Sequence, residues 1–189
     1  MKYKTIALSV VASLSLVAVC ANATAGTTTT NTVNGGTVHF TGQFVNAACA
    51  VSTDTADQTI NLGQYRTASI TAAGQTTTNI PFNIKLVNCD TTVATAASIA
   101  FTGTPDEDNS TLFAVNAGGT NSTAASGVGI QLLDSASNDL PPDGTTYSVA
   151  KTLTDGDNTI PFTARYKSTA ATVTAGQADA DATFVIQYQ

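Results

Sequence analysis

The sequence predicts one all-β domain, built as a sandwich of short strands and held by one disulfide. Short runs of alternating apolar and polar residues follow one another along the chain, and turn residues separate them. No stretch has helical apolar spacing over a useful length. Strands at this spacing, with a single bridge, favour an immunoglobulin-like sandwich. An antibody-type domain is disfavoured, because the sequence has no Trp to pack against the disulfide.

Residues 1–25 have the pattern of a secretory signal. Lys2 and Lys4 form a basic start, residues 6–19 are almost all apolar, and small residues follow at Ala21, Ala23 and Ala25. The apolar run is shorter than the roughly 20 residues that span a membrane. We therefore predict a signal peptide over residues 1–23, with cleavage after Ala25 as the alternative.

Removal of the signal leaves two cysteines, Cys49 and Cys89, in a protein bound for an oxidising compartment. A structural disulfide between them is the expectation. The sequence has no CxxC pair for redox chemistry. One histidine and two distant cysteines do not complete a four-ligand zinc site.

The charge of the chain excludes one class of partner. Without Lys2 and Lys4, five basic residues face 13 acidic ones, which gives a net charge of −8. No basic patch is present to bind nucleic acid. Charged residues make up 11% of the chain, against about 25% in ordinary soluble domains. Such a weakly solvated surface can pack against neighbours.

The segment after the signal is predicted to be an arm. Residues 26–36 are rich in Thr and Gly, which favours a flexible segment. In the stretch that follows, Val38, Phe40, Gly42 and Phe44 alternate with polar residues, as in a strand with one buried face. Because this strand stands at the start of the mature chain, the sheet that it completes need not be its own.

Beyond Cys49 we expect eight further strands, most of them short. The clearest places four apolar residues on one face, from Ile80 to Leu86 at alternate positions. Turn residues fill 139–144 and 155–158. The expected strands are Thr59–Leu62, Asn79–Asn88, Ser98–Thr102, Thr111–Val115, Val128–Leu133, Tyr147–Leu153, Thr159–Lys167 and Asp181–Gln189.

No catalytic, metal or cofactor site is predicted. His39 is the only histidine, and it lies between Val38 and Phe40 in the arm, where an outward-facing strand position is the preferred interpretation. Without it, neither a Ser-His-Asp nor a Cys-His arrangement can be built. The acids of residues 106–108 do not have the spacing of a calcium loop, and a solvated turn is preferred.

Specific strings give the chain a family resemblance. Residues 35–51, 62–68, 158–166 and 178–184 resemble, in this order, the type 1 fimbrial major subunit of enterobacteria. The C-terminus is also similar to the signature of that family. It has a penultimate aromatic residue, Tyr188, and a glycine, Gly176, fourteen positions from the end.

The resemblance implies an incomplete sandwich, the pilin fold, which lacks its seventh strand and accepts one from another chain. Strand donation by pilins is an established form of β-strand addition. Residues 24–43 would be the N-terminal donor-strand extension and residues 44–189 the pilin domain. The implied donor residues are Val38, Phe40, Gly42 and Phe44. The implied C-terminal motif, which meets the chaperone and the groove, consists of Gly176, Ala182, Phe184, Ile186 and Tyr188.

The function implied is that of the major structural subunit of a type 1-like fimbria, which polymerises head to tail into an adhesive rod. The implied partners are identical subunits, a periplasmic immunoglobulin-like chaperone, an outer-membrane usher, and tip adaptor and adhesin subunits. The chain would be exported to the periplasm and end in a fimbrium on the cell surface. The alternatives are a minor, adaptor or terminator subunit, and a monomeric carbohydrate-binding sandwich.

Overall fold

The computed structural model describes residues 31–44, 46–119 and 122–189. The predicted signal peptide lies outside these residues. The chain divides into two compact units, residues 1–42 and 43–189. In the first unit, residues 31–42 form neither helix nor strand.

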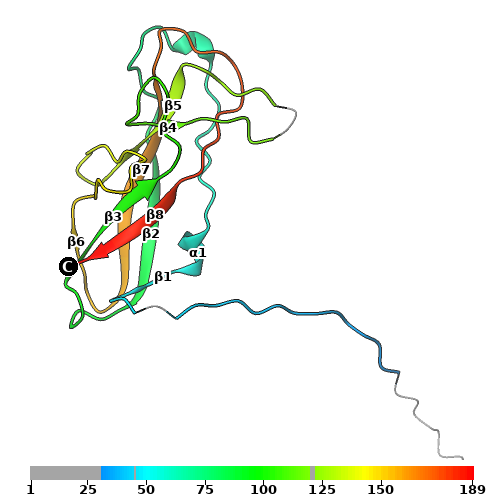
Figure 1. Ribbon diagram of the computed structural model, residues 1–189, viewed down its shortest axis with the longest axis vertical. Coiled ribbons are helices and arrows are strands. Elements are labelled where there is room, and N and C mark those ends of the chain that lie inside the picture. The colour runs from blue at the N-terminus through cyan, green and yellow to red at the C-terminus, as the bar shows by residue number, and fades with distance from the viewer. Residues whose placement is uncertain (1–30, 45, 120–121) are drawn as a thin grey trace, which may run out of the picture. The chain divides into compact units, whose positions relative to one another are not determined.

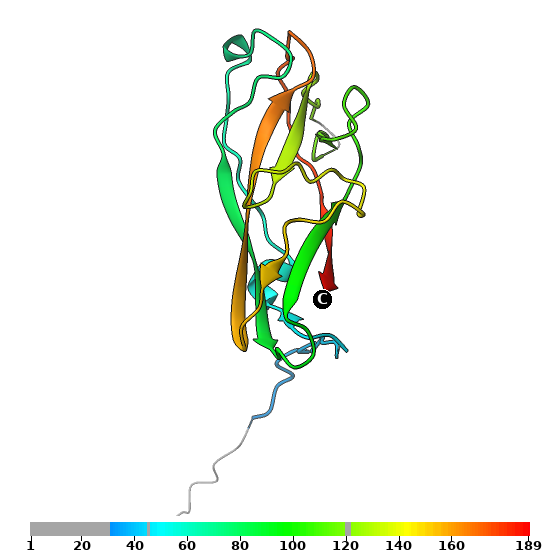
Figure 2. The same cartoon turned by 90° about the vertical axis from the view of Figure 1, so that its left-hand side faces the viewer.

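The second unit contains two antiparallel sheets (Figures 1 and 2). The five-stranded sheet has the order β1-β2-β7-β5-β4, and the three-stranded sheet has the order β6-β3-β8. Two short helices, α1 (Thr53–Ala56) and the 3-10 helix η1 (Thr67–Ser69), interrupt the early part of the unit. The strands are β1 (Ala50–Val51), β2 (Ile80–Cys89), β3 (Ala96–Thr102), β4 (Phe113–Ala114), β5 (Val128–Leu133), β6 (Lys151–Thr152), β7 (Gly156–Ser168) and β8 (Thr183–Tyr188).

The hydrophobic core lies between the two sheets. Alternation along β2 turns Phe82 inward, where its ring stacks on Phe162 of β7 at a centroid distance of 5.6 Å. Phe101 of β3 comes from the opposite sheet and meets Phe162 edge to face at 5.2 Å. Burial of a large aromatic side chain contributes about 1.5–3 kcal/mol. These contacts join the two sheets and confirm the predicted all-β sandwich.

The longest predicted strands are confirmed. Asn79–Asn88, Thr159–Lys167 and Asp181–Gln189 correspond to β2, β7 and β8 within a few residues, and Val128–Leu133 is β5. Ser98–Thr102 forms the greater part of β3. Each of these segments pairs with a neighbouring strand along most of its length, as expected of a segment whose sequence alternates.

Two predicted strands are much shorter than expected. Tyr147–Leu153 contributes only β6, because the Ser148 hydroxyl accepts the N–H of Ile99 at 3.0 Å in place of a main-chain carbonyl. This side-chain acceptor interrupts the ladder. Thr111–Val115 contributes only β4, since the N–H of Leu112 donates to the Asn109 carbonyl at 2.9 Å in a turn.

Two other predictions are wrong. Residues 59–62 form no strand, because no ladder partner lies beside them among the described residues. The turn expected over residues 155–158 is also displaced, since β7 already begins at Gly156 and pairs with Cys89. The Asn158 side chain stabilises the preceding turn by accepting the N–H of Thr154 at 2.9 Å and donating to its carbonyl at 2.6 Å.

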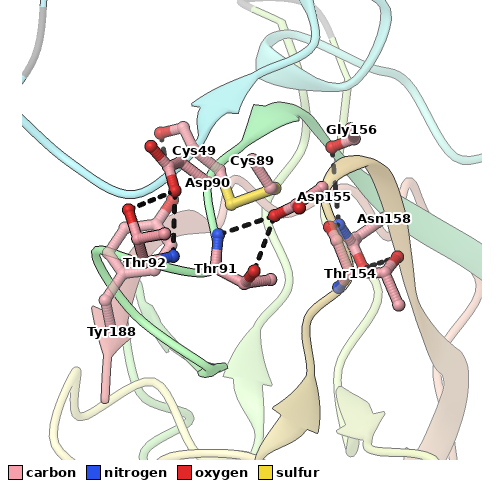
Figure 3. Close-up of a disulfide and its surroundings, with 10 residues drawn as sticks. All are labelled: Cys49, Cys89, Asp90, Thr91, Thr92, Thr154, Asp155, Gly156, Asn158 and Tyr188. Carbon is pink, nitrogen blue, oxygen red and sulfur yellow. Dashed lines mark hydrogen bonds between the residues drawn. A yellow bond between two sulfur atoms is a disulfide. The ribbon is translucent and has the colours of Figure 1, made fainter.

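The predicted disulfide is confirmed (Figure 3), and it joins the residue before β1 to the last residue of β2. Cys49 and Cys89 are joined with their Cα atoms 4.1 Å apart. The Thr91 N–H and hydroxyl donate to the Asp155 carboxylate at 2.8 and 2.7 Å, and these bonds lower the pKa of that carboxyl. The Tyr188 hydroxyl donates to the Cys49 carbonyl at 3.2 Å. The bridge is therefore tied to the last strand as well as to β2.

Candidate functional site: an open groove in the sandwich

A groove with a cavity volume of about 1200 Å³ opens into the core of the second unit. Its floor consists of core side chains from both sheets, among them Phe82 and Ile84 of β2, Phe101 of β3 and Ile130 and Leu132 of β5. A closed sandwich covers such side chains with its own strands. Here they line an accessible channel together with polar residues of its walls.

Two segments far apart in the sequence form the walls of the groove. One consists of residues 55–67 and the other of residues 173–184, which lead into β8. Figure 1 shows the two segments, in cyan and red, along the same side of the sandwich. Within the described structure, β8 pairs only with β3, and residues 57–66 belong to no strand. The groove therefore presents unpaired main chain next to apolar surface, which is a template for an added strand.

Two tyrosines hold the walls at one part of the groove. The ring of Tyr65, from the first wall, meets Tyr166 of β7 edge to face at 5.8 Å. The Tyr166 hydroxyl donates to the Ala178 carbonyl of the second wall at 2.8 Å. Burial, followed by the charges of Asp179 and Tyr65, raises the pKa of Tyr166. The hydroxyl thus stays protonated and remains a hydrogen-bond donor across the neutral pH range.

Gly176 stands where the second wall passes close to another loop. A Cβ at this position would lie 2.4 Å from the Ala124 carbonyl carbon and 2.4 Å from the Ala125 nitrogen. Two main-chain bonds of the next residue fix this approach, because the Gln177 N–H donates to the Thr123 carbonyl at 2.8 Å and the Gln177 carbonyl accepts from the Ala125 N–H at 2.7 Å. Only a residue without a side chain fits between these backbones.

The predicted C-terminal motif is divided between the groove and the core. Gly176, Ala182 and Phe184 line the groove. Ile186 and Tyr188 pack against the hydrophobic core instead. Burial raises the pKa of Tyr188, whose hydroxyl bonds to the Cys49 carbonyl. The motif therefore combines residues that shape the groove with residues that secure the end of β8.

The predicted donor side chains are exposed in the isolated chain. Val38 is 74% exposed, Phe40 is 91% exposed and Phe44 is fully exposed. Residues 31–44 form no strand. Three large apolar side chains are thus exposed within seven residues, a feature typical of interaction surfaces.

The first wall of the groove was not predicted from the sequence as part of a site. Residues 55–67 and the pair Tyr65 and Tyr166 were not predicted as site residues. A signal for the first wall was present, since Ile60 and Leu62 alternate with polar residues and do pack against the core. This pattern was interpreted as a paired strand, although it belongs to a segment whose pairing edge is open.

The other candidate sites carry no special arrangement. In the turn at residues 106–110, an Asp106 carboxylate oxygen accepts the N–H groups of Asp108 and Asn109 at 3.1 and 3.0 Å. The part of the chain that the structure describes contains no group of three or more potential metal ligands. None of its helices is long and apolar enough to cross a membrane.

An open sandwich whose groove exposes core side chains defines a class of protein, the incomplete immunoglobulin-like β-sandwich. Comparisons with known proteins identify the class more closely. The family model "Fimbrial protein" matches residues 38–189. The chain is 55% identical to "Fimbrial subunit type 1" of Salmonella typhimurium over 96% of both chains. It is 51% identical to "Type-1 fimbrial protein, A chain" of Escherichia coli over the full length of both.

Solved structures agree with these relatives. A chain from a chaperone–usher pilus, studied for rod uncoiling, matches with a TM-score of 0.69 and 32% identity, over 85% of this chain and 99% of that one. The P pilus rod subunit PapA matches with a TM-score of 0.63 and 29% identity, over 76% and 100%. The protein belongs to the fimbrial protein family. It is a fimbrial subunit of chaperone–usher type 1 pili, a structural protein of the surface fimbrium rather than an enzyme.

Proposed function

We propose that this protein is the major subunit of its fimbria and polymerises head to tail by strand donation. The extension of one subunit, residues 24–43, and the adjoining Phe44 would supply the strand that the groove of the next subunit lacks. The observation that carries the proposal is the groove that exposes core side chains between two wall segments which no strand of this chain joins to each other. It has the chemistry of a site for an extended, apolar segment rather than for a small polar ligand.

The energies of the arm support a long-lived joint. Val38, Phe40 and Phe44 are exposed, and burial of each would contribute about 1.5–3 kcal/mol. Main-chain hydrogen bonds to one or both walls would add to this. One arm and one groove per chain make a heterologous contact, which generates an open filament when the rotation between subunits does not close a ring.

The open groove also supports the proposal that a chaperone binds the free subunit. Unpaired edges beside apolar surface favour aggregation in a free subunit. A periplasmic immunoglobulin-like chaperone would cover the groove and hold the C-terminal motif. At an outer-membrane usher, the arm of the next subunit would then replace the chaperone. Tip adaptor and adhesin subunits would then occupy the distal end of the fibre.

The assignment as the major rather than a minor subunit rests on the resemblance of residues 35–51, 62–68, 158–166 and 178–184 to the type 1 major subunit. Quantitative mass spectrometry of purified fibres tests this assignment. We expect this chain to exceed every other subunit by a large factor, and a copy number close to that of the adhesin would refute it.

Strand donation is tested by Gly42→Arg in cells that carry the chaperone and usher. A long charged side chain on the buried face of the arm would have to enter a groove floored by core side chains, and the desolvation of its charge is strongly unfavourable. The matched control is Thr41→Arg, which places the same charge one residue away on the opposite face of the strand. We expect rods and heat-resistant multimers with the wild type and Thr41→Arg, and chaperone-bound monomers with Gly42→Arg. Equal polymerisation of all three would contradict strand donation.

A further inference from the structure

Asn34 lies in a setting that favours attack by its own backbone. It is the only asparagine of the sequence that is followed by glycine. Residues 31–44 are exposed coil, so the main chain around Asn34 can adopt the required bend. Gly35 has no Cβ to hinder the approach of its nitrogen to the Asn34 side chain.

A hydrogen bond activates the same side chain. The Asn34 Oδ1 accepts the N–H of Gly36 at 3.2 Å, and Gly36 adopts a positive φ of 118°. During attack on Cγ, negative charge develops on Oδ1. The Gly36 N–H is already directed at the atom that takes up this charge, as a donor in an oxyanion hole would be.

We propose that Asn34 is a site of spontaneous deamidation in the free arm. The Gly35 nitrogen attacks Cγ of Asn34 and loses its proton while the new N–C bond forms. That proton passes through solvent to Nδ2, the bond from Cγ to Nδ2 breaks, and ammonia leaves. The cyclic imide takes up one water at either carbonyl and gives aspartate, or isoaspartate in which the main chain passes through the former side chain. No oxidant or reductant is required.

Three other asparagines distinguish the effect of the hydrogen bond to Oδ1 from the effect of the unhindered glycine nitrogen. Each accepts a main-chain N–H two residues ahead, like Asn34, but each is followed by a residue with a side chain. The Oδ1 atoms of Asn61, Asn109 and Asn116 accept the N–H groups of Gly63, Thr111 and Gly118 at 2.8, 3.1 and 2.8 Å, respectively. The residues that follow these asparagines are Leu62, Ser110 and Ala117. They keep the activating bond and lack the unhindered nucleophile, which makes them internal controls.

The consequence for assembly rests on the proposed function. Deamidation adds a negative charge to the arm shortly before Val38, and Asp57, Asp179 and Asp181 already line the groove. A converted arm would therefore meet like charges. An arm held as a strand is kept extended, which moves the Gly35 nitrogen away from Cγ and stops the reaction. Deamidation at Asn34 would thus mark subunits that have not been assembled.

The experiment follows the purified full chain during incubation at mildly alkaline pH, by peptide mapping and mass spectrometry. We expect Asn34 to convert before Asn61, Asn109 and Asn116, and to give both aspartate and isoaspartate. Gly35→Ala should slow the conversion about ten- to a hundredfold, because it misplaces an intramolecular nucleophile. Gly35 has no positive φ, so alanine fits its backbone. Conversion of Asn34 no faster than of the other three, or an unchanged rate in Gly35→Ala, would overturn the proposal.

A second measurement tests the link to assembly. Fibres and free chains are incubated side by side, and the Asn34 amide is expected to persist only in the fibres. Equal conversion in both would refute protection by the seated arm. The measurement on the free chain needs no polymer, so failure of strand donation, detected with Gly42→Arg, is distinguishable from failure of the deamidation site.

Discussion

Gly176→Ala is the substitution that should reveal most about the groove wall. The added methyl group would lie 2.4–2.5 Å from three backbone atoms of residues 123–125, none of which belongs to a flexible side chain. Either wall or loop must move. Overpacking of this kind costs about 1–3 kcal/mol. The two adjoining main-chain bonds at Gln177, of 2.8 and 2.7 Å, contribute about 1 kcal/mol each when intact. We expect a total loss of about 2–4 kcal/mol in the free energy of unfolding.

Urea denaturation of the oxidised chain measures this loss. The matched control is Gly119→Ala, which lies near the same region but whose new methyl group would meet only the Ser122 hydroxyl at 3.9 Å. Its expected effect is within about 0.5 kcal/mol. A Gly176→Ala variant as stable as the control would refute the steric explanation for this glycine. Retained stability with lost assembly would instead assign Gly176 to recognition by a partner.

Three further predictions concern the domain itself. Replacement of both Cys49 and Cys89 by alanine should lower the free energy of unfolding by about 4 kcal/mol, because the bridge closes a separation of 40 residues. Denaturation of the variant beside the reduced and the oxidised wild type measures this loss, and an unchanged midpoint would contradict it. Phe162→Ala should cost about 3–5 kcal/mol in the same assay, because its buried ring contacts both sheets, and a loss below about 1 kcal/mol would show that the core collapses around the cavity. Hydrogen bonds from the Thr145 and Thr146 main chain and the Thr146 hydroxyl lower the pKa of Asp143 from 3.8 to about 2. The ionised form therefore stabilises the fold above about pH 3.8, and this contribution is lost as the pH falls through 2. Asp143→Asn should flatten the decrease in the unfolding midpoint between these values, and an unchanged slope would contradict the shift.

The parts of the fold that the sequence predicted well are those with a regular partner. In β2, the apolar residues from Ile80 to Leu86 alternate strictly and all turn toward the core. The neighbouring strand β7, which pairs with β2 in the same sheet, alternates in the same register. Periodicity reports which face is buried, so it succeeds where burial and ladder pairing coincide. It does not report where a side chain replaces the main chain as acceptor, as Ser148 does beside Ile99.

The groove walls were harder to predict for the same reason. Ile60 and Leu62 have the alternation of a strand and pack against the core, yet no neighbouring strand pairs with them among the described residues. The local pattern is identical for a paired strand and for one whose partner would come from another chain. Gly176 illustrates a second limit, because its close contact with residues 123–125 depends on a loop more than 50 positions away in the sequence.

The position of the disulfide has a mechanical consequence. In the proposed fibre, tension would pull each subunit through its arm, and the load would reach Cys49 a few residues after the domain begins. The first strand beyond that point, β1, has only two paired residues, so an unrestrained pull would peel it from β2 and then drag away the groove wall that follows. The covalent bond to Cys89 stops the peeling before it begins and passes the load to the end of β2, whose long ladder with β7 resists in shear. If subunits are joined by strand donation as proposed, the bridge would keep the groove wall in place while the arm of the same subunit carries load.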